Sequence, residues 1–70
     1  MKYLIVIEKT STGFSAYSPD VPGCVATGES REEVEREMTE AITFHLEGLK
    51  QEGRQLPPSS TSAAYVEVSV

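Results

Sequence analysis

The 70-residue sequence has one cysteine, six basic residues and no long apolar run. A single cysteine excludes an internal disulfide, a zinc knuckle and a CxxC redox pair. No stretch approaches the roughly 18–20 apolar residues that cross a bilayer. The apolar segment 3–7 is followed by Glu8 and Lys9 and not by a small-residue cleavage site, so no signal peptide is expected. These absences predict a cytoplasmic domain without covalent staples.

The shortage of basic residues also bears on possible partners. Six Lys and Arg against eleven Asp and Glu give a formal net charge of −5. Since affinity for nucleic acid comes mainly from Lys and Arg neutralising phosphates, this balance disfavours direct nucleic-acid binding. An acidic domain is better matched to a basic protein partner, because complementary charge speeds their encounter.

The length of the chain allows one domain, residues 1–70. A domain of this size buries only about 60% of the surface that its unfolded chain exposes. A single small core rarely supplies more than roughly 3–5 kcal/mol of stability. Self-association is the remaining natural way to add stability, so we expect a homo-oligomer, either a dimer or a tetramer.

Four segments have the pattern of β-strands. Residues 2–9 are rich in Ile, Val and Tyr and are apolar on both faces. Residues 14–18 alternate, and residues 24–28 form a short third strand. Residues 63–70 alternate again, with three valines on one face, and predict a fourth strand.

Two connections separate the first three predicted strands. Residues 10–13 (TSTG) make a hairpin connection in which Gly13 can take a positive φ. Residues 19–23 (PDVPG) contain two prolines, which fix φ and remove backbone donors, so regular pairing must pause there. Within this loop Asp20 can accept backbone N–H bonds in an Asx-type turn.

One long helix is predicted after the third strand, capped by Ser30 and running to about Gln51. The segment SREE forms a capping box, in which the Ser30 hydroxyl accepts from the N–H of Glu33 and the Glu33 carboxylate reaches back to the N–H of Ser30. Gly53 suits the position that follows a helix end. One apolar stripe lies on this helix, made by Val34, Met38, Ala41, Ile42, His45 and Leu49.

The predicted order is therefore β-β-β-α-β, an α+β fold with an antiparallel sheet and one helix packed on one face. One helix covers only one face of such a sheet. The opposite face keeps part of the 3–7 segment together with Tyr17 and Tyr65. A second copy of the chain is the simplest cover for that face.

Few side chains could carry chemistry. His45, the single histidine, falls near the centre of the apolar stripe, and no serine or cysteine can be tied to it from the sequence. A semi-buried packing role is therefore favoured over a general base. Cys24 has no Lys or Arg within six residues to lower its pKa, which favours a small buried hydrophobe over a reactive thiol.

The carboxylates are potential Mg²⁺ ligands. Most of them lie on the solvent side of the predicted helix, as is typical of a solvated face: Glu32, Glu33, Glu35, Glu37, Glu40 and Glu47. Glu8 and Asp20 lie elsewhere, and turn chemistry accounts for Asp20. Gly13, Gly23 and Gly28 are isolated, so no phosphate-binding loop is formed. We expect no catalytic, cofactor-binding or metal-binding residue and no cofactor, and predict that the protein is not an enzyme.

Three segments in order carry a combined motif. They are Glu8-Lys9 with Gly13-Phe14-Ser15-Ala16, then PDVPGC at 19–24 with Ala26-Thr27-Gly28 and Glu32-Glu33, then EAITFHLEGL at 40–49 with Gly53 and Leu56-Pro57. Together they resemble the HicB-like antitoxin family, also described as an uncharacterised short-protein family. The resemblance covers about residues 1–58 at family-like spacing.

The resemblance implies a three-stranded sheet, a helix and a further strand, similar to a stripped-down ribonuclease H core. Members of the family typically neutralise HicA, a small basic toxin that cuts mRNA using a histidine, by covering its active surface. A HicA-like toxin partner and self-association are therefore implied for this chain. An acidic inhibitor opposite a basic RNA-binding protein agrees with its charge.

Full-length antitoxins usually carry a C-terminal DNA-binding segment, either ribbon-helix-helix or helix-turn-helix. This chain reaches Val70 with its last predicted strand, so operator binding by this chain alone is not expected. Two other functions stay open. One is an orphan regulatory or ligand-binding domain without a toxin partner. The other is a degenerate nuclease, whose Mg²⁺-dependent RNA cleavage would disappear when Glu8 or Asp20 is replaced by alanine.

Overall fold

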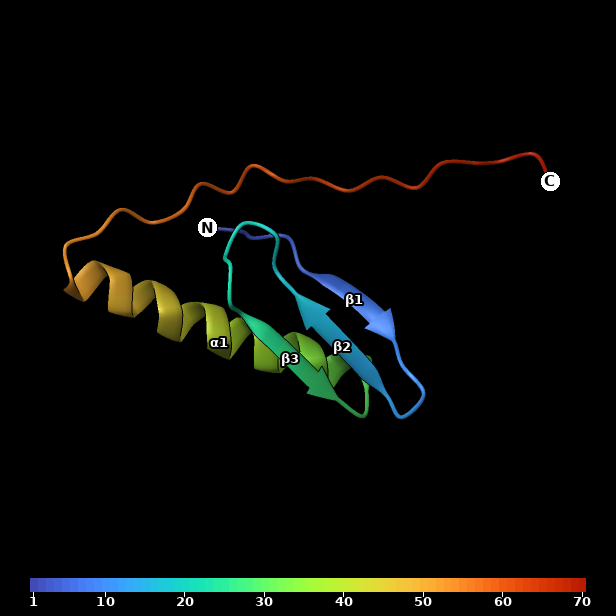
Figure 1. Cartoon of the computed structure of the whole chain (residues 1–70), viewed down its shortest axis with the longest axis horizontal. Helices are drawn as coiled ribbons and strands as arrows, with labels where there is room; N and C mark the ends of the chain where they lie inside the picture. The colour runs from blue at the N-terminus through green and yellow to red at the C-terminus, as the bar shows by residue number, and fades with distance from the viewer.

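The computed structural model describes residues 1–70 and contains three strands and one helix (Figure 1). In chain order they are β1 (Val6–Lys9), β2 (Phe14–Tyr17), β3 (Val25–Gly28) and α1 (Arg31–Gln51). The strands form one antiparallel sheet in the order β1-β2-β3. α1 packs on one face of this sheet. The predicted α+β class and the β-β-β-α order are confirmed.

The pairing register decides which side chains face α1. Ala16 of β2 is paired with Ile7 of β1 and with Ala26 of β3, and all three belong to the core or pack against it. Because side chains alternate along a strand, the neighbouring paired residues lie on the opposite, open face of the sheet. These open-face residues are Val6, Tyr17 and Val25. The prediction that one face stays uncovered by the helix is therefore confirmed for Tyr17.

The core is small, with six buried residues: Ala16, Val21, Cys24, Val34, Met38 and Ile42. α1 supplies every fourth residue to it, from Val34 through Met38 to Ile42, and Leu46 continues the same row. This spacing keeps the apolar side chains on one side of a helix. Val21, from the proline-rich loop, is fully buried, so that loop closes one end of the core.

The predicted position of His45 within the buried stripe is wrong, because His45 is exposed. α1 has 21 residues and spans roughly 31 Å. Each four-residue strand spans only roughly 13 Å. The C-terminal part of α1 therefore extends beyond the strands, and His45 instead borders a surface hollow beside Pro22 and Pro57.

The first strand is shorter than predicted, because regular pairing begins at Val6 and not at Lys2. Val6 is paired with Tyr17, so Leu4 comes level with Pro19, which has no backbone N–H to donate. The Ser18 hydroxyl donates to the carbonyl oxygen of Leu4 at 2.9 Å in place of a ladder bond. Residues 2–5 thus approach the sheet without being part of a strand.

Gly23 and Gly13 are required for different reasons. Gly23 has a φ of +89°, in the region that favours glycine, and lets the proline-rich loop turn into β3. Gly13 does not have a positive φ, contrary to the prediction. A Cβ at Gly13 would instead collide with the carbonyl oxygen of Gly28, so close backbone approach is what requires glycine there.

The helix begins with the predicted Ser30 cap, but the Glu33 carboxylate binds a different backbone N–H from the one predicted. The Ser30 hydroxyl accepts from the N–H of Glu33 at 3.1 Å. The Glu33 carboxylate reaches back one residue further than predicted and accepts from the N–H of Glu29 at 3.0 Å. Both groups still satisfy backbone donors at the helix entrance, which are otherwise left without intrahelical partners.

Replacing Ser30 with alanine is expected to lower the free energy of unfolding by about 1 kcal/mol, because the N–H of Glu33 loses its acceptor. Urea denaturation followed by circular dichroism measures this loss. Ser30→Asp is the matched control, since aspartate also caps helices and should keep most of the stability. Equal midpoints for Ser30→Ala and the parent chain would contradict the assigned cap.

The helix ends at the predicted glycine. Gly53 has a φ of +72°. Its N–H donates to the carbonyl oxygen of Lys50 at 3.0 Å, and the N–H of Arg54 donates to that of Leu49 at 2.9 Å. This pair of bonds is a Schellman motif, which satisfies the last carbonyls of the helix and turns the chain back toward the sheet.

The predicted fourth strand is not part of the sheet. Residues 63–70, here named the C-terminal arm, pair with no strand and run past the N-terminus to the far side of the molecule (Figure 1). A strand forms only where a partner backbone satisfies its donors and acceptors. The alternating pattern therefore identified a segment with the side-chain pattern of a strand, which stays unpaired in this structure.

Candidate interaction surfaces

The Asp20 carboxylate anchors the chain just before the C-terminal arm. It accepts from the backbone N–H groups of Ser60 and Thr61, both at 2.9 Å, and from the Thr61 hydroxyl at 2.7 Å. The sequence interpretation of Asp20 as an Asx-type turn residue is therefore wrong. Its bonds join the proline-rich loop to residues forty positions away.

Two further bonds tie the same segment to the N-terminus. The Tyr3 hydroxyl donates to the carbonyl oxygen of Pro57 at 2.6 Å, and the Ser59 hydroxyl donates to that of Lys2. With Asp20, these contacts hold residues 57–61 beside the start of the chain. The direction in which the C-terminal arm leaves the molecule is thus fixed by its anchored root.

Acidification is expected to release this anchor. The Thr61 hydroxyl, followed by the N–H groups of Thr61 and Ser60, lowers the pKa of Asp20 because these donors stabilise the carboxylate. Because the pKa is lowered on folding, the stability that this anchor contributes is fully present above the unfolded-state pKa of Asp20. It is lost as the pH falls through the lower folded-state pKa. Amide chemical shifts of Ser60 and Thr61 should change in that range by NMR. Amide shifts that stay constant there, or that titrate equally in Asp20→Asn, would contradict the anchor.

The thiol of Cys24 and the imidazole of His45, the possible nucleophile and base, lie in different surroundings. Cys24 is buried, its thiol lies 3.8 Å from the carbonyl oxygen of Ala41, and burial raises its pKa. A protonated, buried thiol is a packing group, as predicted. His45 is exposed on α1 and has no hydrogen-bonded partner.

No group of three His, Cys, Asp or Glu side chains converges as a metal site. No helix has the length and apolar character for crossing a membrane.

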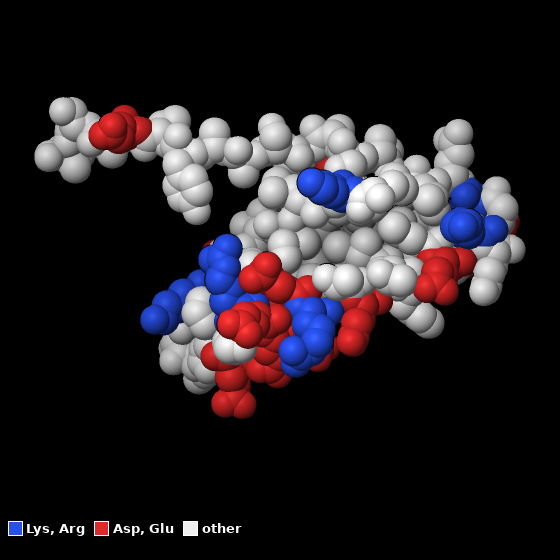
Figure 2. Space-filling view, turned by 180° about the vertical axis from the view of Figure 1, so that it is seen from behind, with Lys and Arg blue, Asp and Glu red and all other residues white.

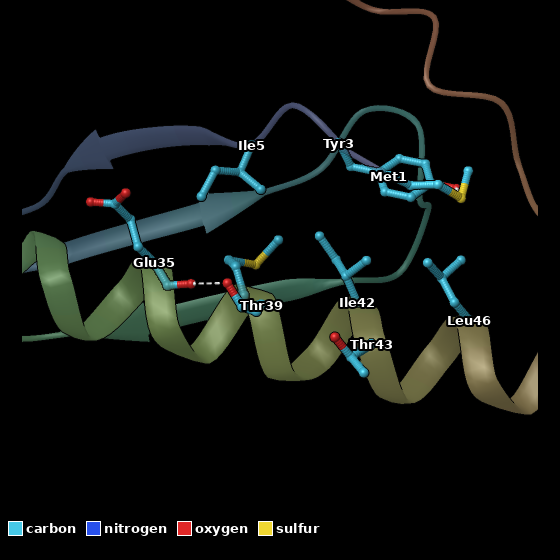
Figure 3. A pocket seen from close by; sticks show the side chains of 9 residues that line it. Met1, Tyr3, Ile5, Glu35, Thr39, Ile42, Thr43 and Leu46 are labelled. Atoms are coloured by element: carbon cyan, nitrogen blue, oxygen red, sulfur yellow. Dashed lines mark hydrogen bonds between the residues drawn. The ribbon is translucent and has the colours of Figure 1, made fainter.

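An open groove lies between the start of the chain and α1, here named the β1–α1 groove (Figure 3). It measures about 370 Å³. Tyr3 and Ile5 form one wall, and Ile42 and Leu46 rise from α1 to form the other. Met38 lies at its base, fully buried. The groove is thus lined mainly by apolar side chains of residues 1–5 and α1, together with Glu35, Thr39 and Thr43.

The outer face of α1 carries a row of acidic side chains, here named the acidic row. Its members recur at spacings of four, three and seven and so share one side of the helix: Glu33, Glu37, Glu40 and Glu47. Figure 2 shows acidic side chains gathered along α1, with basic ones interspersed. Arg31 pairs with Glu35 at 3.6 Å, which lies outside the row. Glu37, Glu40 and Glu47 are exposed, whereas Glu33 is half-buried and accepts from the N–H of Glu29, so three carboxylates of the row face solvent freely.

Phe44 lies on the same side of α1 as the acidic row, between Glu40 and Glu47. Its side chain is 82% exposed, although large aromatic groups are more often buried. Exposed aromatic side chains framed by charge are typical anchors of protein interfaces. The sequence analysis identified the acidic face but did not single out Phe44. The available signal was its spacing of four from Glu40 and three from Glu47.

The fold and these surfaces can be compared with known proteins. Residues 3–69 match the family described as HicB_like antitoxin of bacterial toxin-antitoxin system. The chain belongs to the HicB-like antitoxin family. The predicted resemblance is confirmed, and it extends further along the chain than the motifs suggested, since the match includes all but the last residue of the C-terminal arm.

Individual relatives are similar over most of this chain. The chain is 39% identical over 66 residues to an uncharacterised 14.9 kDa protein in the rep-hol intergenic region of Haemophilus phage HP1, covering 94% of this chain and 50% of that protein. It is 30% identical over 69 residues to Antitoxin HicB 2 of Photorhabdus laumondii, covering 97% and 50%. The chain thus spans about half the length of these two relatives.

A solved structure is similar as well. A chain of the HicA3 and HicB3 toxin-antitoxin complex superimposes with a TM-score of 0.68 at 38% sequence identity, covering 84% of this chain and 70% of that chain. The fold of this chain is therefore similar to that of a chain solved in a toxin-antitoxin complex.

Proposed function

We propose that this chain is a toxin-binding module that neutralises a small basic HicA-type mRNA-cleaving toxin, acting as a homo-oligomer in the cytoplasm and without catalysing a reaction itself. The observation that carries the proposal is the 38% identity and TM-score of 0.68 to a chain of the HicA3 and HicB3 toxin-antitoxin complex. The formal net charge of −5 supports it, because an acidic inhibitor is steered toward a basic RNA-binding toxin.

The acidic row with Phe44 is the surface that best fits such a partner. Glu37, Glu40 and Glu47 supply negative charge along one side of α1, and Phe44 supplies an apolar anchor among them. Charged rims speed encounter and set register, whereas a buried aromatic anchor supplies most of the binding energy. The Phe44 side of α1 therefore combines both requirements of a toxin-binding face.

The mass of the purified chain, measured by light scattering alone and with a small basic HicA-type protein encoded beside its gene, tests the proposal. A heavier mixed complex is expected, and its association rate should fall with added salt because the encounter is electrostatic. Glu37→Lys with Glu40→Lys should slow association several-fold, whereas Glu67→Lys, off the acidic row, should change it less. A chain that ignores the toxin would support the second candidate, an orphan regulatory domain.

A further inference from the structure

A hollow lies at the C-terminal end of α1, here named the His45 hollow. It measures about 320 Å³ and is lined by six residues from three parts of the chain: Pro22, His45, Leu49, Arg54, Gln55 and Pro57. A smaller hollow of about 190 Å³ shares His45, Leu49 and Arg54 with it and reaches Phe44. The two hollows therefore form one continuous surface that begins at Phe44.

Hydrogen bonds hold the walls of the His45 hollow in place. At the end of α1 the N–H of Arg54 donates to the carbonyl oxygen of Leu49 at 2.9 Å, and this Schellman motif turns the chain back beside the helix. The carbonyl oxygen of Pro57 accepts from the Tyr3 hydroxyl at 2.6 Å. The backbone of these lining residues is therefore ordered before a partner binds, which lowers the entropic cost of binding.

The polar side chains that line the His45 hollow are rich in hydrogen-bond donors. The guanidinium of Arg54 carries several N–H groups, and its one ion pair, with Glu52 at 3.4 Å, is exposed and contributes little. The imidazole of His45 and the side-chain amide of Gln55 add further donors. No carboxylate lines this hollow, and Glu47, the member of the acidic row closest in sequence, lines neither of the two hollows. A donor-rich, positive site on an acidic chain favours an anionic group.

A carboxylate carried by a larger molecule fits this lining best. The guanidinium of an arginine binds a carboxylate through two parallel hydrogen bonds. Leu49, Pro22 and Pro57 supply apolar surface for the methylene groups that carry such a carboxylate. Arg54 and His45 are exposed, so a free small anion is held only weakly against water. The carboxylate therefore has to be presented by a partner that also binds elsewhere on the chain.

We propose that the His45 hollow receives an acidic side chain of the protein partner that packs on Phe44. This inference rests on the toxin-binding face proposed above and adds a charge of opposite sign to it. Along the chain, Glu37 and Glu40 precede Phe44, whereas Arg54 follows the end of α1. A partner docked the other way round would bring like charges together, so these charges fix the orientation of binding.

Charge reversal at Arg54 is the first test. Arg54→Glu is expected to weaken affinity for a HicA-type toxin roughly ten-fold or more in calorimetric titration, because it removes the donors and repels the bound carboxylate. Arg54→Lys keeps the charge but loses the paired hydrogen bonds, so its affinity should lie between those of Arg54→Glu and the parent. Lys9→Glu is the matched control, since it makes the same change of charge at the exposed end of β1 and should not weaken binding.

The second test identifies the carboxylate on the toxin. Each exposed acidic residue of the toxin is replaced by lysine in turn and titrated against the parent and Arg54→Glu chains. One replacement should weaken binding to the parent and restore binding to Arg54→Glu. Such mutual dependence is measured as the coupling energy of a double-mutant cycle, and a general effect of net charge does not produce it.

A probe that needs no toxin separates this site from the proposed function. N-acetylglutamic acid α-amide, in large excess, should shift the NMR signals of the His45 ring and the Arg54 Nε–H group, whereas the neutral N-acetylglutamine amide should not. A parent chain that binds no toxin yet shows these shifts would support the carboxylate site and overturn only the toxin-binding function. Equal shifts with both amides, larger shifts with inorganic phosphate, or an Arg54→Glu chain that binds toxin as tightly as the parent would overturn the site.

Discussion

Met38→Ala is expected to leave the chain largely unfolded at room temperature. Met38 is fully buried at the centre of α1, between the sheet and the base of the β1–α1 groove. Truncating a buried methionine costs about 2–5 kcal/mol, the sum of lost burial and a residual cavity. A core of this size supplies only roughly 3–5 kcal/mol in total, so the loss is comparable to the whole stability of an isolated chain.

Thermal unfolding followed by circular dichroism measures this effect. Thr39→Ala is the matched control, because Thr39 is the exposed neighbour on the same helix and donates only to the carbonyl oxygen of Glu35. Its unfolding free energy should stay within about 0.5 kcal/mol of the parent. A Met38→Ala chain that melts at the parent temperature would mean that the core lies elsewhere.

The second large effect concerns binding rather than stability. Phe44→Ala is expected to weaken affinity for a HicA-type toxin by roughly 30-fold or more, equivalent to about 2 kcal/mol, as for an aromatic hot spot at an interface centre. Because Phe44 is exposed in the free chain, its removal should leave the melting temperature almost unchanged. Calorimetric titration of toxin into each variant measures the loss.

Val25→Ala is the control for this experiment, since Val25 is also an exposed apolar residue and lies on the open face of the sheet. Its toxin affinity should equal that of the parent. If Val25→Ala weakened toxin binding and Phe44→Ala did not, the toxin-binding face would be the open sheet and not the acidic row.

Local chemistry in the sequence predicted the parts of the fold that depend on neighbouring residues. The Ser30 cap, the Gly53 helix end and the four-residue spacing of Val34, Met38 and Ile42 are all satisfied within a few residues. Alternation likewise placed Tyr17 on the face opposite the helix. Such features need no knowledge of distant contacts, so a single sequence suffices for them.

Features that depend on distant segments were not predictable in the same way. The partners of Asp20 are Ser60 and Thr61, and no local pattern links residues so far apart. His45 is exposed although Leu46, one residue further along α1, packs against the core, so its exposure depends on which side of the helix meets the sheet. The C-terminal arm has the alternation of a strand, but alternation does not say which backbone it pairs with.

The candidate binding surface was likewise predictable only in part. Composition predicted an acidic domain suited to a basic partner, and the carboxylates were correctly assigned to the outer side of the helix. Phe44 was named only as part of the family motif and was not singled out as a surface residue. Its spacing from Glu40 and Glu47 already indicated the acidic side of α1, and the structure adds that Phe44 is exposed while Leu46 packs against the core.

Protection of RNA from a HicA-type toxin tests the proposed function most directly. The toxin would be incubated with mRNA and increasing amounts of this chain, and the intact RNA measured on a gel. Cleavage should stop near equimolar chain, and Phe44→Ala should shift the required concentration upward by the factor found in the binding titration. RNA cleaved at an undiminished rate in the presence of excess folded chain would contradict the assignment of a toxin-neutralising role.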